Sequence, residues 1–254
     1  ASALLPRAPS AWRSSSPRSC AAPQRATEEA TAGASEPETE SFVQGPLRRA
    51  AMTLHTREQA PREGQVEAPK REPYTPTLLD YVTFLVDSRA VYTTLERLVQ
   101  EDERLAALRS TGLERGDALA RDLEYLAPRL SPAELPSPTR RGRDYAAYLE
   151  GTLAESFPRF MCNYYNHYFA HTAGGRMIGK SMSKLLLDGE TLDFYKWDGE
   201  VAPLLAATRA SIDAMAAQWT DEEKQACLDE TGATFSYGGS LLVPLNTPPD
   251  RRED

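Results

Sequence analysis

The sequence has few cysteines and no long apolar stretch. Its 254 residues include only three cysteines, too few for a disulfide framework. No segment approaches the roughly 18 apolar residues that a membrane-spanning helix needs, so we expect a soluble protein without a membrane anchor. The formal net charge of -8 disfavours non-specific binding of nucleic acid.

The first 27 residues lack acidic side chains altogether. They contain four arginines, many serines, alanines and prolines, and no apolar core of the kind found in secretory signals. This composition is typical of an organelle transit peptide, and an ordinary disordered tail is the alternative. Residues 28–41 are acidic and rich in Ala, Thr and Ser, which predicts a disordered linker, so order should begin near Phe42. We expect residues 246–254 to be a disordered tail.

Alternation of apolar and polar residues, the pattern of a half-buried strand, is missing as well. After residue 42, nearly every periodic segment has helical spacing instead. The predicted helices begin at Pro46, after Thr77, near Leu119, near Tyr145, after Ser156, near Leu204 and after Thr220. Thr77 with Asp80 and Thr220 with Glu223 have the spacing of capping pairs, and four prolines in residues 128–138 enforce a non-helical connection. The sequence therefore predicts one all-α domain.

Three glycines lie inside one of these predicted helices. Gly174, Gly175 and Gly179 occur in FAHTAGGRMIGKSMSKLLL, residues 169–187, where each destabilises the helix by roughly 1 kcal/mol relative to alanine. Glycine inside an element indicates that another group approaches the backbone closely. One interpretation is a non-catalytic interaction domain, in which the glycines let two helices pack closely. The other is a bound ligand.

Metal ligands are scarce, since the chain has only three histidines. His167 and His171 share one helix face, but a zinc site needs at least a third ligand and none accompanies them. No acidic residue precedes a histidine by three positions, so the pattern of di-iron bundles is also missing. For His167 we expect a partly buried ring bonded to its surroundings. Cys162 and Cys227 have no partner at metal-ligand spacing, and we expect reduced, semi-buried thiols.

His55 stands in a different context, on a short helix with an apolar face. Arg48 and Arg49 lie about 10 Å away from it along the helix axis. This arrangement suits an iron porphyrin, whose iron an imidazole can ligate and whose propionates guanidinium groups can bind. A second helix with glycines in its middle could then approach the opposite face of the ring.

Five segments together resemble the heme oxygenases of the plastid type, from plants and algae. They are LHTREQA around His55, GLERGDALARDLEYL (112–126), YYNHYFAHTAGGRMIG (164–179), LDFYKWDGE (192–200) and WTDEEKQACLDET (219–231). The resemblance covers roughly residues 42–245, and AGGRMIG with FYKWDG is a specific combination. It implies a single-domain, all-α heme oxygenase-like fold over 42–245, with heme between a proximal helix and a kinked distal helix.

The resemblance also implies roles for the residues that contact heme. His55 matches the proximal ligand of the heme iron, and Gly174 and Gly175 match distal glycines whose bare backbone lies against the ring. His171 stands where animal and bacterial relatives carry an aspartate that organises distal water, and other plastid-type members similarly have histidine at this position. The small size of the two glycines would leave room for O₂ and direct cleavage to one position of the ring, and His171 could hold ordered water.

Three further residues are implied at the edge of the ring. Arg48 and Arg209 match residues that pair with the heme propionates, and Tyr165 matches a tyrosine that lines the pocket.

The sequence departs from the family pattern at two places. Gly45 and Pro46 interrupt the start of the first helix, so this helix should begin later than in relatives, and SMSK after Gly179 is less charged.

The implied reaction uses heme as both substrate and cofactor, with O₂, and yields biliverdin IXα, carbon monoxide and ferrous iron. A [2Fe–2S] ferredoxin is the implied electron donor in the plastid stroma, and bilin synthesis, with a bilin reductase downstream, would use the product. We expect a monomer. The alternative is a catalytically weak porphyrin-binding or regulatory relative.

Docking of an acidic ferredoxin on an acidic protein requires a local basic face. The predicted contributors lie near the motifs: Arg48, Arg49, Arg57, Lys180, Lys184 and Lys196.

Overall fold

The computed structural model describes residues 41–59, 74–132 and 134–252, and the side chains of residues 55–59 lie outside this description. The predicted transit segment, residues 1–27, and residues 28–40 of the predicted linker fall outside the described residues. All regular structure in the described part of the chain is helical, which confirms the predicted all-α class. No helix in that part is long and apolar enough to cross a membrane.

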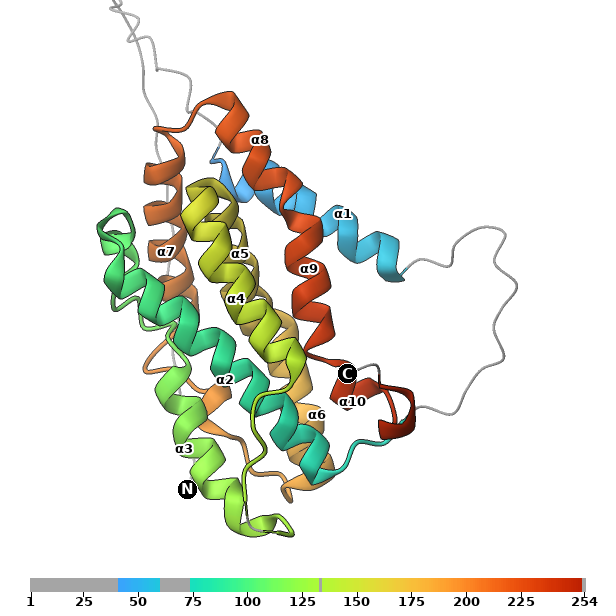
Figure 1. Ribbon diagram of the computed structural model, residues 1–254. Coiled ribbons are helices and arrows are strands. Elements are labelled where there is room, and N and C mark those ends of the chain that lie inside the picture. The colour runs from blue at the N-terminus through green and yellow to red at the C-terminus, as the bar shows by residue number, and fades with distance from the viewer. Residues whose placement is uncertain (1–40, 60–73, 133, 253–254) are drawn as a thin grey trace, which may run out of the picture. The chain divides into compact units, whose positions relative to one another are not determined.

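Figure 1 shows the helices of the described residues. They are α1 (Arg48–Gln59), α2 (Leu78–Glu101), α3 (Gly116–Leu126), α4 (Arg140–Glu155), α5 (Phe157–Ala170), α6 (Arg176–Leu186), α7 (Val201–Ala216), α8 (Asp221–Asp229), α9 (Thr231–Ser240) and α10 (Val243–Asn246). Two π-helical turns extend them, Val43–Leu47 before α1 and His171–Gly175 between α5 and α6. A 3₁₀ turn, Asp193–Tyr195, lies between α6 and α7.

Local capping signals place several helix starts. Thr77 and Asp80 form a complete capping box at α2, and Thr220 and Glu223 form one at α8, so both predicted pairs are confirmed. Such caps satisfy backbone N–H groups that have no partner inside the helix. Ser156 is the N-cap of α5 as predicted, although its side chain makes no capping hydrogen bond.

Two predicted boundaries were wrong. The first helical segment does not begin at Pro46, because this residue lies inside the π-helical turn Val43–Leu47, which already has helical backbone. Proline has no N–H to leave unpaired there, and Leu47 donates to the Phe42 carbonyl at 3.0 Å. The last predicted helix is divided into α8, α9 and α10, with the first break at Glu230.

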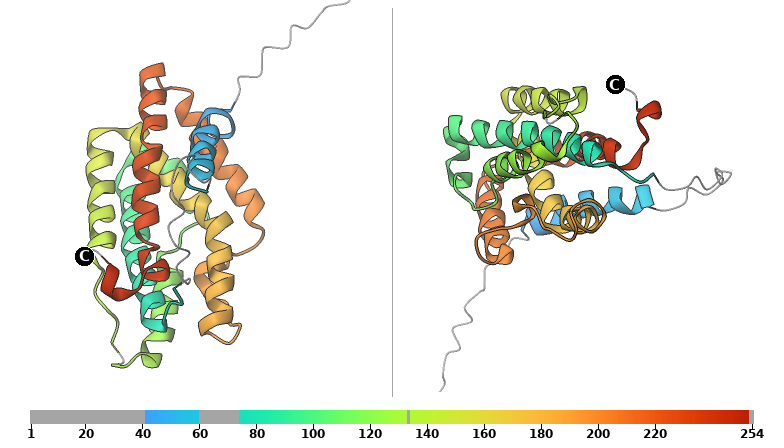
Figure 2. Two further views of the ribbon diagram at one scale, coloured as in Figure 1. Left: turned by 90° about the vertical axis from the view of Figure 1, so that its right-hand side faces the viewer. Right: turned by 90° about the horizontal axis from the view of Figure 1, so that it is seen from below.

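The core lies where α2 packs against α3 and α4, and where α4 packs against α5. Figure 2 shows α2 and α4 side by side. Gly142 of α4 meets Asp87 of α2 so closely that an added Cβ would lie 2.6 Å from the carboxylate Oδ1 and 2.9 Å from Cα. Any larger residue would push these helices apart, so glycine sets their separation.

A buried charge network holds α5 in place. The Glu230 carboxylate, 4% exposed, accepts hydrogen bonds from the Tyr148 hydroxyl (2.6 Å), Arg159 Nε (2.7 Å) and Asn163 Nδ2 (2.8 Å). These bonds join α4, α5 and the junction of α8 with α9. Removing these partners would leave the buried Glu230 carboxylate without compensation, which is unfavourable, so the network favours this position of α5.

The chain after α10 is held at the start of α2. Arg252 Nη2 donates to Asp80 Oδ1 at 2.6 Å and to the Pro244 carbonyl at 3.0 Å. Of the predicted tail, residues 246–254, the structure describes 246–252, and these bonds attach Arg252 to α2 and α10. Asp80 also accepts from the Tyr74 hydroxyl at 2.5 Å, so one carboxylate caps α2 and anchors the tail.

Candidate functional site

The predicted glycine-bearing helix is a continuous helical path with a π-helical turn in its middle. α5 runs to Ala170, the turn His171–Gly175 follows, and α6 begins at Arg176. π-helical turns inside α-helices are rare and frequently lie at functional sites. The turn begins at a predicted site residue, His171, and ends at the predicted pair Gly174 and Gly175.

The three glycines of this path are not equivalent. A Cβ added to Gly174 would meet no atom within 4 Å among the described residues, whereas at Gly175 it would lie 2.5 Å from His171 Nδ1. At Gly179 it would lie 2.7 Å from the ring of Tyr195. Glycine is therefore needed at 175 and 179 because a larger residue would collide with the side chains of His171 and Tyr195. Of the three glycines, only Gly174 faces open space among the described residues.

An exposed strip of small residues runs along the same side of the helix as Gly174. Ala170, Ala173 and Gly174 are exposed, and the next turn adds Met177, which is 73% exposed. Their spacing of three and four residues places them on one face. A face of bare backbone and methyl groups, ending in a flexible thioether, can accept a flat apolar group at close range.

His171 is held inside the protein rather than on this strip. Its Nε2 lies 2.9 Å from the Phe194 carbonyl oxygen, and its ring stacks on the Phe194 ring with centroids 4.0 Å apart. Burial lowers the His171 pKa to about 3, so the imidazole is neutral near pH 7. Because a carbonyl can only accept, Nε2 carries the proton and Nδ1 presents a lone pair on the Gly175 side.

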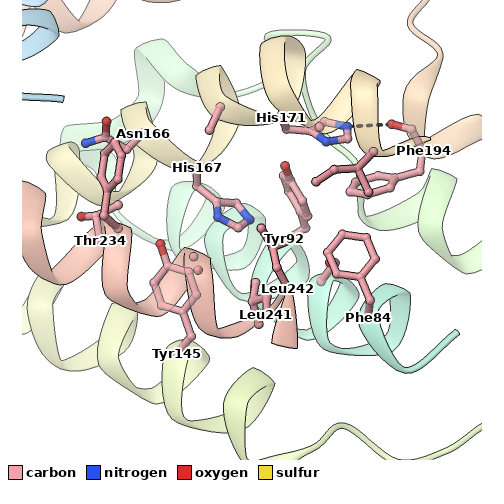
Figure 3. A pocket seen from close by; sticks show the side chains of 17 residues that line it. Phe84, Tyr92, Tyr145, Asn166, His167, His171, Phe194, Thr234, Leu241 and Leu242 are labelled. Atoms are coloured by element: carbon pink, nitrogen blue, oxygen red, sulfur yellow. Dashed lines mark hydrogen bonds between the residues drawn. The ribbon is translucent and has the colours of Figure 1, made fainter. Parts of the chain in front are cut away.

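A cavity of about 250 Å³ lies beside α5, the π-helical turn and α6 (Figure 3). It is lined mainly by apolar and aromatic side chains, including Phe84, Tyr92, Tyr145, Ile178, Leu241 and Leu242. Gly175 and Ala170 also border it, which places the cavity next to the exposed strip.

His167 points into this cavity between Tyr92 and Tyr145 (Figure 3). Its ring centroid is 4.5 Å from that of Tyr92 and 5.5 Å from that of Tyr145. Among the described residues no group pairs with its buried Nε2, so the predicted hydrogen bond to the surroundings was wrong. Burial lowers the His167 pKa to about 4. A neutral nitrogen facing a cavity in this way is suited to bind water.

The structure brings together Tyr165, Arg209 and Arg48, the three residues that the resemblance places at the edge of the heme ring. Tyr165 of α5 is 7% exposed, and burial raises its pKa, while the nearby guanidinium charges of Arg209 and Arg48 oppose that shift. The Arg209 guanidinium lies over the ring of Phe169 at 5.0 Å, and the Phe169 and Tyr165 rings are 4.4 Å apart. Residues from α1, α5 and α7 thus form one basic, aromatic corner.

His55 lies on α1 as predicted, but its side chain falls outside the described residues, as does that of Arg57. Within the described part of the chain, no cluster of three or more His, Cys, Asp or Glu residues could hold a metal ion.

The predicted basic residues differ in their surroundings. Lys180 and Lys184 are exposed on α6 beside an open cleft that Arg176 and Met177 also line. Lys196 is instead paired with Asp193 at 3.1 Å. Arg176 was missed by the sequence reasoning, although its spacing of four residues from Lys180 places both on one helix face.

The two cysteines among the described residues are free thiols, as predicted, but both are fully buried. They are also neighbours, because the Cys227 thiol donates to Cys162 and so lowers the pKa of Cys162. This contact between α5 and α8 could not be predicted, because the two cysteines are far apart in the sequence.

Comparison with known proteins identifies a single family. The heme oxygenase family model matches residues 75–242, a range that begins after His55. The chain is 44% identical over 213 residues to heme oxygenase 1, chloroplastic, of Arabidopsis thaliana, which covers 81% of this chain and 74% of the relative. It is also 37% identical over 175 residues to the probable inactive heme oxygenase 2, chloroplastic, of the same plant, covering 68% and 58%.

Solved structures share the fold at lower identity. Heme oxygenase 2 of Chlamydomonas reinhardtii without heme has a TM-score of 0.62 at 18% identity, covering 83% of this chain and 100% of that one. Heme oxygenase-1 of Synechocystis in complex with heme has a TM-score of 0.62 at 15% identity, covering 80% and 90%. The helical architecture is therefore the same in all three.

Proposed function

This chain belongs to the heme oxygenase family, and we propose that it opens the heme ring to biliverdin IXα, releasing carbon monoxide and ferrous iron. The observation that carries the proposal is the exposed strip of Ala170, Ala173, Gly174 and Met177. A Cβ at Gly174 would occupy the space that a flat ring needs, and the space in front of it is open. Small residues there fit a heme held against the helix.

The basic corner fits the polar edge of the same group. Arg48 and Arg209 would pair with the propionates, and Tyr165 would donate a hydrogen bond or line the edge. Guanidinium–carboxylate pairs are among the stronger charge-assisted hydrogen bonds. A porphyrin with its face on Gly174 and its carboxylates in this corner would match apolar protein to apolar ring and positive charge to negative charge.

Heme, when bound, supplies both the ring to be cleaved and the iron that reacts with O₂. His55 on α1 would be the iron ligand, in neutral form. On the opposite side, the neutral His171 would hold a water molecule through the Nδ1 lone pair, because Nε2 is already used by the Phe194 carbonyl. This histidine would thereby perform the task that the resemblance assigns to a distal aspartate in other relatives.

The cavity behind the helix supports this use of water. Its volume of about 250 Å³ can hold several water molecules, and buried waters persist where polar partners are present. His167 Nε2 would accept a hydrogen bond from one of them. The apolar walls would keep bulk solvent away, so protons would arrive through these few positioned groups.

Electrons would come from reduced ferredoxin at the basic face of α6. Arg176, Lys180 and Lys184 are exposed there and lie beside the strip proposed to hold heme. Lys196 is a weaker candidate than the sequence suggested, because Asp193 neutralises it. A local positive patch would offset the repulsion between two acidic proteins.

The same proposal places the protein in the plastid stroma. Curated relatives at 43–44% identity are described as chloroplastic, and residues 1–27 have the composition of a transit peptide. Biliverdin made there would feed bilin synthesis, with a bilin reductase as the next enzyme. A fusion of residues 1–27 to a reporter should enter plastids, and a cytosolic reporter would contradict this localisation.

The test is hemin turnover with reduced ferredoxin, followed by chromatography of the product. A Soret band on adding hemin, with biliverdin formed on reduction, supports the proposal. A Soret band without biliverdin would instead favour a porphyrin-binding or regulatory role; the 37%-identical relative is named as a probable inactive heme oxygenase. Failure to bind hemin would favour an interaction domain.

A further inference from the structure

The short segment after α6 is held by a carboxylate from α3. Asp122, 5% exposed, accepts the backbone N–H of Asp193 at 2.8 Å through Oδ1 and that of Phe194 at 2.7 Å through Oδ2. The acceptor and its donors are 71 and 72 residues apart. Because each oxygen binds a different N–H, the carboxylate fixes both the position and the orientation of this backbone.

The same backbone holds His171 from the other side. Phe194 gives its N–H to Asp122 and receives the His171 Nε2–H on its carbonyl oxygen at 2.9 Å. Its ring also stacks on the imidazole with an interplanar angle of 19°. One residue therefore connects a buried carboxylate with the imidazole of the π-helical turn.

A second side chain fixes the far end of this segment. Arg115, 7% exposed, donates through Nη1 to the Lys196 carbonyl, and its guanidinium lies over the Trp197 ring at 4.9 Å. Residues 193–197 are thus held at both ends from the region of α3. The Phe194 carbonyl therefore has little freedom to follow a change in the His171 ring.

We propose that Asp122 is a positioning residue that fixes the tautomer of His171. By holding the Phe194 carbonyl at Nε2, it keeps the proton on Nε2 and the lone pair on Nδ1, beside Gly175. This rests on the proposed function, in which the Nδ1 lone pair holds a water molecule. With the opposite tautomer, Nδ1 would donate, and the carbonyl would face an unprotonated Nε2.

The experiment measures the ring ¹⁵N shifts of His171 in the full heme-free chain by NMR. The wild type should contain one tautomer, with the proton on Nε2. Asp122→Asn presents an amide in place of one acceptor oxygen, so the Phe194 carbonyl should lose its fixed position. We expect a second tautomer, or a mixture, at His171 in this variant, and Asp122→Glu, which keeps a carboxylate, should partly restore the single form.

Asp87→Asn is the matched control. Asp87 is also buried, and it accepts the backbone N–H and the hydroxyl of Thr139 at 2.6 Å each, at the contact of α2 with α4. Its loss should disturb packing without changing the His171 tautomer. An equal change of His171 in Asp87→Asn would overturn the proposal, since the effect would then come from general loosening.

Two further results would contradict the proposed role of Asp122. A wild type with the proton on Nδ1 contradicts the proposal without any variant, so a failure of Asp122→Asn to fold leaves the wild-type test in force. An unchanged single tautomer in a folded Asp122→Asn contradicts it too.

Turnover separates this inference from the proposed function. Asp122→Asn should bind hemin within about twofold of wild type but degrade it about tenfold more slowly, as losses of supporting hydrogen bonds typically do. A wild type that fixes the predicted tautomer but cannot degrade hemin would contradict the proposed function alone. A wild type that degrades hemin with the other tautomer would contradict the role of Asp122 alone.

Discussion

Alanine substitutions at the adjacent glycines of the π-helical turn should have opposite effects on the stability of the heme-free protein. At Gly174 the new methyl group would meet nothing within 4 Å among the described residues. Alanine is favoured over glycine by up to about 1 kcal/mol in a helix, so Gly174→Ala should stabilise the protein by a fraction of that amount.

At Gly175 the same methyl group would lie 2.5 Å from His171 Nδ1 and 3.3 Å from its Cγ. The ring cannot move away without losing its bond to the Phe194 carbonyl, because both rings are stacked. An unpaired buried donor costs about 1–3 kcal/mol. After the helix gain is subtracted, Gly175→Ala should destabilise the protein by about 1–2 kcal/mol.

The assay is urea denaturation of both heme-free variants beside wild type, followed by titration with hemin. Gly174→Ala should be the more stable variant by about 2 kcal/mol, yet it should bind hemin more weakly, because its methyl group occupies the proposed ring face. Gly174→Leu should weaken binding further or change the cleaved position. The reasoning fails if the two alanine variants are equally destabilised, or if Gly174→Leu binds and cleaves hemin as wild type does.

The remaining predictions concern ligation, pH and electron supply. His55→Ala should fold but lose reductant-driven turnover, which added imidazole should partly restore; full turnover without imidazole would rule out His55 as the ligand. Because burial keeps the His167 pKa near 4 against about 6.5 when unfolded, the unfolded state binds the proton first, and stability should fall as pH drops below about 6.5. The loss from His167 should reach about 2 kcal/mol at pH 5, so urea denaturation of His167→Phe should show a shallower fall from pH 7 to pH 5; an equal fall would refute this origin. Raising salt from about 0.01 M to about 1 M shortens screening from about 30 Å to about 3 Å, and ferredoxin-driven turnover should fall steeply while turnover with a small neutral reductant changes little. Reversing Lys180 and Lys184 to glutamate should reproduce that loss at low salt without weakening hemin binding, and insensitivity to both changes would place docking elsewhere.

Features set by neighbouring residues were predictable from the sequence. Thr77 with Asp80 and Thr220 with Glu223 form their capping boxes within one helical turn, so spacing alone identified them. The glycine-bearing segment could be singled out for the same reason, because helix propensity makes glycine conspicuous there. The division between Gly174 and Gly175 could not, since it depends on which way each missing Cβ points.

Features set by distant residues were not predictable. In the sequence, Asp122 is one polar residue within an apolar helix pattern. The residues whose N–H groups it binds, Asp193 and Phe194, follow it by 71 and 72 positions. The contact of Cys162 with Cys227 and the network around Glu230 likewise join α5 to elements far along the chain. That His167 Nε2 has no partner among the described residues depends on the cavity that several helices line. Periodicity carries no information on any of these contacts.

The central claim is that heme lies against Gly174 and is opened by this protein. The most direct measurement is the product of hemin incubated with the wild-type chain, reduced ferredoxin and O₂, identified by chromatography together with the released gas. We expect biliverdin IXα and carbon monoxide. Hemin that binds and is reduced but yields neither product would contradict it.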